Sequence, residues 1–382
     1  MSSPQASSYQ QPPQPPSSYS SHAHHLHGLH YSRRDVDGDS VPMSPDDAED
    51  NYGPTHIPPP KSAVTLMREA KERKGSDGYM AICAPMVRYS KLPFRELVRT
   101  YGVDLAYTPM ILADVYKHSV YSRDLEFRTN AADSPVVVQF AASTGVDLAD
   151  AAELAAPYSN GVDLNCGCPQ RWAISEKIGS YLMEDPERVR DMVRQVKARV
   201  GGMRMADGEP YPVSVKIRVH ADPRRTVEFV KRAESVGVDW VTVHGRTAKQ
   251  RSTEPVDLDA IKLVKENASV PVFANGDVFS LEDADRIVAH TRADGVMAAR
   301  GLLENPALFA GYKHTPMSAV QDFVRLSTAY GSVHFIFHHH LMYMLESSMS
   351  RAEKKTFNIL SSGPAIIDYL QGHYGLDFSK RT

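Results

Sequence analysis

The sequence predicts a parallel β/α-barrel of the TIM type, and three observations lead to this fold class. Eight short apolar runs occur between residues 80 and 298, with starts about 25–31 residues apart except for one interval, from 161 to 213. Helix-start signals stand between these runs. Several runs are nearly continuous in β-branched or aliphatic residues, as expected for parallel strands buried on both faces. Eight such units over about 230 residues match the size of one TIM barrel.

The eight apolar runs are the predicted strands, and they stand in chain order at 80–86, 105–110, 136–141, 161–165, 213–219, 240–244, 270–274 and 295–298. The alternative is a doubly wound open sheet, which normally has fewer strands and a glycine-rich fingerprint after the first. The turn after the first run reads Ala-Pro-Met-Val over 84–87 and has no such glycine pattern. The barrel is therefore the preferred fold.

Capping residues mark helix starts between the strands. Asp185 and Asp222 each precede a proline, which places an N-cap before a proline at the first helical position. Ser280 and Asp283 have the spacing of a capping box, and Asn305-Pro306 is interpreted as one more cap with proline. These signals predict the helices of successive β/α units.

Two regions flank the barrel, which is predicted over 80–315. Residues 1–60 hold 11 of the 26 prolines and almost no aliphatic side chains, so they are predicted to be disordered. The histidines between 22 and 30 are interpreted as low-complexity sequence, and no metal site is predicted. Residues 61–79 are predicted to lead into the barrel as a basic helix. Residues 316–382 lose the β/α rhythm and are predicted to form an all-helical domain.

Composition limits the classes of function. Only three of the 382 residues are cysteines, so disulfides are not expected to hold the fold together. The sequence has no apolar run near the roughly 20 residues of a membrane helix and no apolar core of a secretory signal. No membrane contact and a reducing compartment, cytoplasm or nucleus, are therefore expected. The net charge of −3 includes seven acidic residues and two arginines within 1–60, so the remainder is slightly basic and suits a polyanionic partner.

The most informative stretch is 161–169, which reads Gly-Val-Asp-Leu-Asn-Cys-Gly-Cys-Pro. It places two of the three thiols, Cys166 and Cys168, where a strand ends and a loop begins. Active sites of TIM barrels form at the carboxyl ends of the strands, so this placement suggests a thiol that takes part in chemistry. The alternative is that both cysteines are small apolar fillers of the core.

Polar residues recur at the carboxyl ends of other predicted strands. Lys216 lies between two aliphatic residues of the fifth run, and His244 ends the sixth run before Gly245-Arg246. The alternative for Lys216 alone is a lysine that extends its charged end to solvent, and the alternative for His244 alone is a core histidine with its hydrogen bonds satisfied. Polar residues are costly in a barrel core unless they are satisfied, so their recurrence at one end favours function.

The last two strands predict an anion site. Asn275-Gly276-Asp277 and Arg300-Gly301 follow strands seven and eight, where TIM barrels commonly bind phosphate. Taken alone, Asn275-Gly276-Asp277 would be interpreted as an ordinary turn and Arg300 as a surface arginine. Together, backbone N–H groups at the glycines, a helix N-terminus and Arg300 would hold an anion. A phosphate there, Lys216 midway and a thiol opposite fit a flat phosphorylated cofactor such as flavin mononucleotide (FMN).

By these motifs the chain resembles the tRNA-dihydrouridine synthase family from about residue 80 to its C-terminus. The motifs are Ala-Pro-Met at 84–86, Asp-Leu-Asn-Cys-Gly-Cys-Pro-Gln at 163–170, Val-Lys-Ile-Arg at 215–218, Thr-Val-His-Gly-Arg-Thr at 242–247 and Asn-Gly-Asp-Val at 275–278. Residues 168–173 and 297–303 are most similar to the eukaryotic branch that acts at positions 20a and 20b of the tRNA D-loop. One departure is 177–180, where relatives often have a glycine nearer to 177 or 178. The tail 1–60 has no counterpart in the family core.

The resemblance implies an FMN-containing barrel joined to a C-terminal helical domain that binds tRNA. In the family, NADPH or NADH reduces the flavin, the flavin gives hydride to C6 of a flipped-out uridine, and a cysteine at the position of Cys168 protonates C5. An ordinary thiol, with a pKa of about 8.5, holds its proton at neutral pH. Contacts to FMN are implied for Pro85, Met86, Val87, Gln139, Lys216, His244, Asn275, Gly276, Asp277, Ala299 and Arg300. Contacts to tRNA are expected from Asn165, Arg246, Lys249, Arg251 and Arg351, and a monomer is expected.

Two other functions remain open at this point. An FMN barrel that reduces a small molecule, such as a dihydropyrimidine or dihydroorotate dehydrogenase relative, would have no need of the helical region 316–382. A non-catalytic tRNA-binding protein with a vestigial flavin site is disfavoured by the intact set of Cys168, Lys216 and His244. Reduction of free uridine or uracil would favour the first of these, and a flavin that tRNA does not reoxidise would favour the second.

Overall fold

A computed structural model describes residues 61–75 and 78–378 of the chain. The predicted disordered tail, residues 1–60 with its histidines, lies outside the described residues. The strands of the described part are β1 (Met80–Cys83), β2 (Leu105–Tyr107), β3 (Ile111–Leu112), β4 (Val136–Ala141), β5 (Gly161–Cys166), β6 (Val213–Arg218), β7 (Trp240–His244), β8 (Val272–Asn275) and β9 (Gly295–Ala298).

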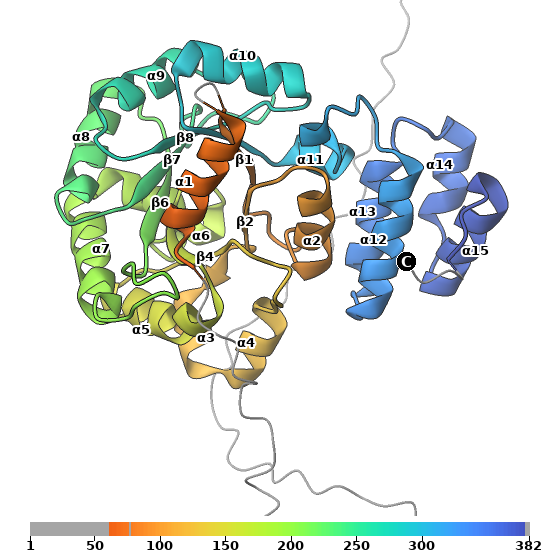
Figure 1. The fold of residues 1–382 in the computed structure, drawn as a ribbon, viewed down its shortest axis with the longest axis horizontal. Coiled ribbons are helices and arrows are strands. Elements are labelled where there is room, and N and C mark those ends of the chain that lie inside the picture. Colours follow the sequence, from red (N-terminus) through yellow and green to blue (C-terminus); the bar gives the residue numbers. More distant parts are fainter. Residues whose placement is uncertain (1–60, 76–77, 379–382) are drawn as a thin grey trace, which may run out of the picture. The chain divides into compact units, whose positions relative to one another are not determined.

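The strands close into a barrel. β2 pairs with β1 on one side and with β4 on the other, so β1, β2 and β4 to β9 form a closed ring. The pairings around this ring are parallel, and Figure 1 shows the helices placed around it. The predicted TIM barrel is confirmed, and each of the eight predicted strands is present. β3 is an addition that the sequence did not predict, and it extends the edge of β4.

Helices connect the strands, and most of the predicted caps are present. The carboxylates of Asp185 and Asp222 accept hydrogen bonds from the Arg188 and Arg224 amides, and the Ser280 hydroxyl accepts one from the Asp283 amide. Each such cap contributes about 1 kcal/mol. The helices of the described residues are α1 (Ala63–Lys74), α2 (Leu92–Thr100), α3 (Ala113–His118), α4 (Val120–Glu126), α5 (Gly145–Ala155), α6 (Arg171–Ser175), α7 (Pro186–Val200), α8 (Pro223–Glu234), α9 (Leu258–Asn267), α10 (Leu281–Thr291), α11 (Arg300–Glu304), α12 (Met317–Ala329), α13 (His334–Met344), α14 (Arg351–Asn358) and α15 (Gly363–Tyr374).

The predicted helix start at Asn305 is wrong. Asn305 ends α11, and its side-chain oxygen accepts a hydrogen bond from the Ala307 amide over 3.1 Å. The segment that follows is a single 3₁₀ turn, Leu308–Ala310, which ends at Gly311. Asn305 is therefore the C-cap of α11, and the 3₁₀ turn that follows begins after Ala307 and ends at Gly311 in the left-handed conformation.

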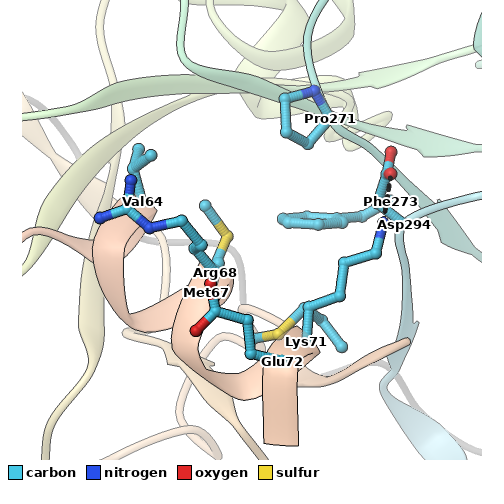
Figure 2. Close-up of a pocket in the computed structure, with 9 residues that line it drawn as sticks. Val64, Met67, Arg68, Lys71, Glu72, Pro271, Phe273 and Asp294 are labelled. Carbon is cyan, nitrogen blue, oxygen red and sulfur yellow. Dashed lines mark ion pairs between the residues drawn. The ribbon is translucent and has the colours of Figure 1, made fainter. Parts of the chain in front are cut away.

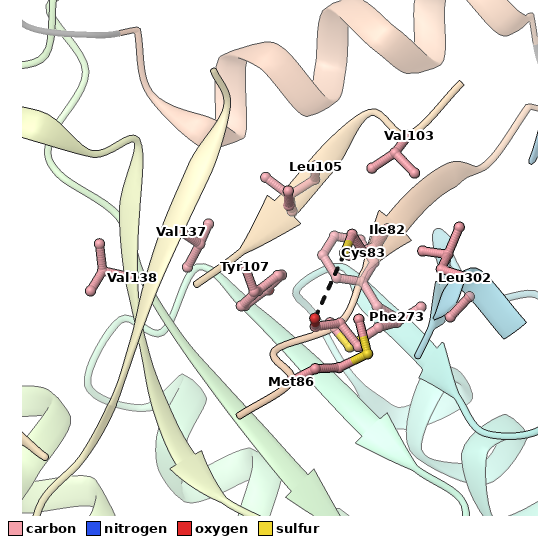
Figure 3. Close-up of a cluster of buried hydrophobic side chains, with 14 of the residues drawn as sticks. Ile82, Cys83, Met86, Val103, Leu105, Tyr107, Val137, Val138, Phe273 and Leu302 are labelled. Carbon is pink, nitrogen blue, oxygen red and sulfur yellow. Dashed lines mark hydrogen bonds between the residues drawn. The ribbon is translucent and has the colours of Figure 1, made fainter. Parts of the chain in front are cut away.

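Burial along the strands separates the core from the mouth of the barrel. β1, β2, β4, β5, β8 and β9 are buried at every residue. Figure 3 shows part of this core, with side chains contributed by β1, β2, β4 and β8. In β6 and β7 the partly exposed residues are Lys216, Arg218 and His244, which lie toward the carboxyl ends. The apolar sequence runs thus build the core, and the polar residues that follow them gather at one end.

The lead-in helix α1 lies at the opposite, amino end of the barrel. The Ser62 hydroxyl caps it, and the Ala63 amide donates to the Asn160 carbonyl just before β5. A cavity of about 270 Å³ lies between α1 and the barrel, and the ion pair of Lys71 and Asp294 (3.7 Å) lies at its edge. Figure 2 shows Met67 and Phe273 among the residues that line it. The cavity is therefore remote in the fold from the predicted site.

The C-terminal part of the described chain is helical, as predicted. α12 packs against α2, and α13 packs against α11, α12, α14 and α15. α2 and α11 follow β1 and β9, so these helices rest on the β/α units that adjoin the first and last strands. None of the helices in the described residues has the length and hydropathy needed to cross a membrane.

Candidate active site

The register of the barrel brings polar side chains of consecutive strands together. Asn165 in β5 is paired with Lys216 in β6, and Arg218 in β6 is paired with His244 in β7. His244 is in turn paired with Asn275 in β8. Residues in register on parallel strands direct their side chains to the same face, because side chains alternate along each strand. These five residues therefore share the carboxyl end of the barrel.

Lys216 presents a positive charge in this group. Its Nζ donates a hydrogen bond to Asn275 Oδ1 over 2.9 Å, and Asn275 Nδ2 donates to the Met297 carbonyl over 2.8 Å. Burial, together with the nearby charge of Arg218, lowers the pKa of Lys216 to about 8. The partner of the ammonium is a neutral amide, so its charge is not neutralised by that contact. The site is therefore suited to stabilise negative charge on a bound group.

His244 is a neutral imidazole. Burial and the surrounding cations Lys216, Arg218 and Arg246 lower its pKa to about 2, so it stays uncharged at physiological pH. Arg246 Nη1 donates to His244 Nε2 over 3.4 Å. The ring proton is then assigned to Nδ1, which leaves His244 one N–H donor.

A small cavity lies beside His244, at the ends of β8 and β9. It has a volume of about 90 Å³ and is lined by residues of the two predicted anion-binding turns, including Asn275, Gly276, Asp277, Ala299 and Arg300. Gly276 has a φ of 129°, and a Cβ there would lie 2.7 Å from the Val256 side chain. Only glycine lets the backbone pass this close, so the turn is shaped as a cradle.

Two arginines flank the cavity, and a carboxylate connects them. Arg246 Nη2 forms an ion pair with Asp277 Oδ2, and Arg300 Nη2 donates to Asp277 Oδ1 over 2.9 Å. Helix α11 begins at Arg300, with its N-terminus at the cavity. Two guanidinium groups against one carboxylate leave a net positive charge, which suits an anion.

The structure places Arg246 differently from the three other cations predicted to contact tRNA. Its side chain is only 2% exposed, and Nε donates to the Glu254 carbonyl over 2.6 Å. This placement favours a role in the wall of the anion cavity over a contact at the protein surface. Lys249 and Arg251, in the same loop after β7, are exposed, and Arg351 is exposed at the start of α14.

A chain of buried amides fixes the loop after β5. Asn165 Oδ1 accepts hydrogen bonds from the Gly167 and Cys168 amides over 3.1 and 2.9 Å. Asn165 Nδ2 donates to Gln139 Oε1 over 2.8 Å, and Gln139 Nε2 donates to Asp163 Oδ2 over 2.7 Å. A carboxylate only accepts hydrogen bonds, so Asp163 determines which group donates in each hydrogen bond of this network. The backbone of Cys168 is thereby tied to a buried charge.

The two cysteines of the motif occupy different environments. Cys166 is fully buried in β5, and burial raises its pKa well above the usual range. Cys168 is partly exposed on the loop beyond the strand. A buried thiol of raised pKa is inert, whereas a thiol on the loop is accessible to a substrate.

The segment 177–180 also holds the Cys168 loop. The Ser180 amide donates to the Cys168 carbonyl over 2.9 Å. Gly179 has a φ of 63°, and a Cβ there would lie 2.7 Å from that carbonyl oxygen. Lys177 also has a positive φ, of 60°. Gly179 is therefore required for the close approach of this segment to Cys168.

The loop after β1 carries the remaining predicted cofactor residues. Pro85 is partly buried, Met86 is buried, and Val87 is 50% exposed. The Met86 amide donates to the Ser90 hydroxyl over 3.0 Å, which closes the loop into a turn ahead of α2. The structure therefore places these residues at the carboxyl end of β1, on the same end of the barrel as Lys216 and His244.

Sequence reasoning missed Asp163, Ser214 and Arg218. Ser214 Oγ donates to Asp163 Oδ1 over 2.6 Å, and burial raises the pKa of Asp163 to about 6. Arg218 Nε donates to the Gly167 carbonyl over 2.8 Å and so supports the cysteine loop. Asp163 and Ser214 precede Asn165 and Lys216 by two residues, so the period of two in each strand is a signal that could have found them.

Comparison with known proteins gives one family and close relatives. The model of the family described as "Dihydrouridine synthase (Dus)" matches residues 82–365. A human protein named as a tRNA-dihydrouridine(20a/20b) synthase (NAD(P)+)-like protein is 53% identical over 317 residues, which cover 82% of this chain and 98% of the relative. Proteins named tRNA-dihydrouridine(20a/20b) synthase (NAD(P)+) from Schizosaccharomyces pombe and Saccharomyces cerevisiae are 46% and 40% identical, over 77% and 83% of this chain and 87% of each relative.

Proposed function

This chain belongs to the dihydrouridine synthase family, and on that premise we propose that it reduces the C5–C6 double bond of a uridine in the D-loop of tRNA. Three relatives that are 40–53% identical to it are named for positions 20a and 20b and for NAD(P)+. The observation that carries the proposal is the partly exposed Cys168, held by Asn165 at the same end of the barrel as Lys216 and His244. NADPH or NADH is the proposed electron donor.

The residues at the mouth fit FMN as the cofactor. The cavity between Arg246 and Arg300, with its glycine cradle at Gly276, has the size and charge for a phosphate group. When bound, the flavin supplies the hydride chemistry that the amino acids lack. Lys216 would stand against the electron-rich edge of the ring, and neutral His244 would donate a hydrogen bond from Nδ1. The proposed contacts to FMN are Pro85, Met86, Val87, Gln139, Lys216, His244, Asn275, Gly276, Asp277, Ala299 and Arg300. Arg246 is a further proposed contact, because it is buried in the wall of the cavity.

Cys168 is the proposed general acid. In the reaction, C6 of the uracil ring gains a hydride and C5 gains a proton, so a proton donor must lie beside the ring. The Cys168 thiol would give this proton and be reprotonated from solvent. Asn165 and Arg218 fix the loop backbone, so the thiol is oriented before the substrate arrives. Asn165 itself is proposed to lie within reach of the uridine.

The tRNA itself would be held outside the barrel. Lys249 and Arg251 are exposed beyond β7, and Arg351 is exposed on the C-terminal helices, so these cations are available to phosphates. We assign the barrel, 80–315, to the chemistry and the helices of 316–378 to tRNA binding. A D-loop uridine is unpaired, which lowers the cost of turning the base out of its stack. A monomer in the cytoplasm or nucleus would suffice for this reaction.

The experiment that tests the function uses the full chain, NADPH and a tRNA transcript that contains no dihydrouridine. Mass spectrometry of the digested tRNA is expected to find dihydrouridine in the D-loop, at 20a or 20b. Free uridine and uracil, assayed in parallel, are expected to remain unreduced. Equal reduction of free uridine would instead support a small-molecule reductase. A flavin-loaded protein that binds tRNA and forms no dihydrouridine would contradict the proposal.

A further inference from the structure

The C-terminal helices contact the same loop that carries three of the proposed cofactor residues. This loop, 84–91, follows β1 and includes Pro85, Met86 and Val87. Its last part, Arg88 to Tyr89, meets α13 through a hydrogen bond to the backbone, a hydrogen bond to a side chain and several ring contacts. These contacts cross from one region of the sequence to another about 250 residues away, so neither region alone determines the shape of the loop.

The central contact joins His340 to the backbone of the loop. His340 Nε2 donates to the Tyr89 carbonyl over 3.1 Å. The His340 ring is 1% exposed and stacks on Phe94 of α2 with ring centroids 4.5 Å apart. It also packs against Phe323 of α12, with ring centroids 4.8 Å apart. The imidazole is thus held between the barrel and α12, with its N–H directed at one loop carbonyl.

The tautomer of His340 follows from its partners. The Tyr89 carbonyl only accepts, so the ring proton lies on Nε2. Nδ1 is buried and has no hydrogen-bond partner among the described residues. Burial lowers the pKa of His340 to about 3, so the ring is neutral at physiological pH. The contact is therefore present throughout the pH range in which the protein works.

Further contacts attach the same part of the loop to α13. The Tyr89 hydroxyl is 3.1 Å from His339 Nδ1, and the Tyr89 ring meets Tyr343 edge to face at 5.7 Å. The Arg88 guanidinium lies over the Phe335 ring at 5.8 Å. Three positions along α13, one turn apart, thus touch two consecutive loop residues.

The loop needs such support because its backbone is strained. Arg88 has a φ of 72°, a left-handed conformation that is unfavourable for a residue with a side chain. Such a conformation persists only where the surroundings determine it. On the barrel side, the Tyr89 and Ser90 amides donate to the Met86 carbonyl over 3.0 and 3.1 Å. The Tyr89 carbonyl accepts from the Lys91 amide over 2.8 Å within the loop, and His340 donates to it across the boundary with α13.

We propose that His340 is a positioning residue, through which the C-terminal helices hold the loop 84–91 in the shape that binds the cofactor. The inference rests on the proposed function, because it takes Pro85, Met86 and Val87 as cofactor contacts. It also assigns to these helices a role in the cofactor site in addition to the one proposed for tRNA.

The chain offers a matched control on the same helix. His338 is buried at 7% exposure, and its Nε2 donates to the Phe357 carbonyl of α14 over 3.0 Å. Its ring meets Phe357 edge to face at 5.0 Å. His338 therefore has the same chemistry and a similar burial to His340, but its hydrogen bond points away from the loop.

The experiment compares His340→Phe with His338→Phe in the full chain stripped of flavin. Hydrogen exchange of the 86–90 amides and the FMN dissociation constant are measured, together with the melting temperature. We expect His340→Phe to speed exchange in 86–90 and to weaken FMN binding at least tenfold. His338→Phe should lower the melting temperature with both loop measurements unchanged. Should His340→Phe not fold, His340→Met, which keeps an apolar side chain and removes the N–H donor to the Tyr89 carbonyl, takes its place with the same expected results.

Two results would overturn the inference: unchanged exchange and FMN affinity in His340→Phe or His340→Met, or equal losses in the His338 control. His340→Gln gives a further check, because its amide can donate to the Tyr89 carbonyl and should restore part of the affinity. If the unsubstituted protein binds no FMN, the proposed function fails. The exchange comparison still decides whether His340 restrains the loop.

Discussion

Replacement of Gly179 by alanine is expected to destabilise the fold and to disturb the cysteine loop together. Gly179 has a φ of 63°, and a Cβ there would lie 2.7 Å from the Cys168 carbonyl oxygen and 2.9 Å from the Cys168 Cβ. The left-handed backbone costs an L-residue roughly 1–2 kcal/mol. Overpacking of a filled site costs about 1–3 kcal/mol more. The free energy of unfolding should therefore fall by about 2–5 kcal/mol.

Gly331→Ala isolates the first of these two costs. Gly331 has nearly the same φ, 66°, but a Cβ there would meet no atom within 4 Å. This variant should lose only the roughly 1–2 kcal/mol of backbone strain. Urea unfolding of both variants and of the unsubstituted chain measures the difference. The alkylation rate of the loop thiol by iodoacetamide should change in Gly179→Ala and stay constant in Gly331→Ala. Equal losses of stability, with equal alkylation rates, would refute the argument that Gly179 is needed for close approach to Cys168.

Two further predictions follow from the buried charges of the barrel. Lys216→Met should weaken FMN binding by about 10- to 100-fold, the usual worth of a hydrogen bond to a charged group. The substitution should not lower the melting temperature, because the lowered pKa of Lys216 means that folding disfavours the charged form of the lysine. Normal FMN affinity or a clear loss of stability in Lys216→Met would contradict this prediction. The raised pKa of Asp163 means that the native state binds a proton more tightly than the unfolded chain does. The free energy of unfolding should therefore fall by about 3 kcal/mol as the pH rises from 3.8 through about 6. Asp163→Asn should remove this fall in urea titrations between pH 4 and 7, and parallel curves for the two proteins would contradict the assignment.

Local sequence patterns were sufficient to predict the barrel. The eight apolar runs became the eight strands, because a strand buried on both faces must be apolar along most of its length. Asp185, Asp222 and Ser280 cap helices as predicted, because a cap depends on residues within one turn. The same logic failed at Asn305, which ends α11 and is followed only by a single 3₁₀ turn that stops at Gly311. β3 was missed because two residues carry no periodic signal.

The candidate site could be predicted only in part. The register of parallel strands brings Lys216, His244 and Asn275 to one end, and this follows from their position in each predicted strand. The burial of Arg246 against Asp277 depends on the path of two loops, which the sequence does not specify. The contact between His340 and Tyr89 depends on how the C-terminal helices pack against the barrel, so no local pattern could reveal it.

Cys168 is proposed to protonate the uracil ring, and a comparison of Cys168→Ala with Cys166→Ala is the direct test of this role. Both variants should oxidise NADPH and retain flavin, because neither step uses the thiol. Cys168→Ala should form dihydrouridine in tRNA about 10²–10⁴-fold more slowly, the usual contribution of a general acid. Cys166→Ala should form it at nearly the normal rate, because that thiol is fully buried within β5. The account is contradicted if the two variants behave the other way round, or if neither slows the formation of dihydrouridine.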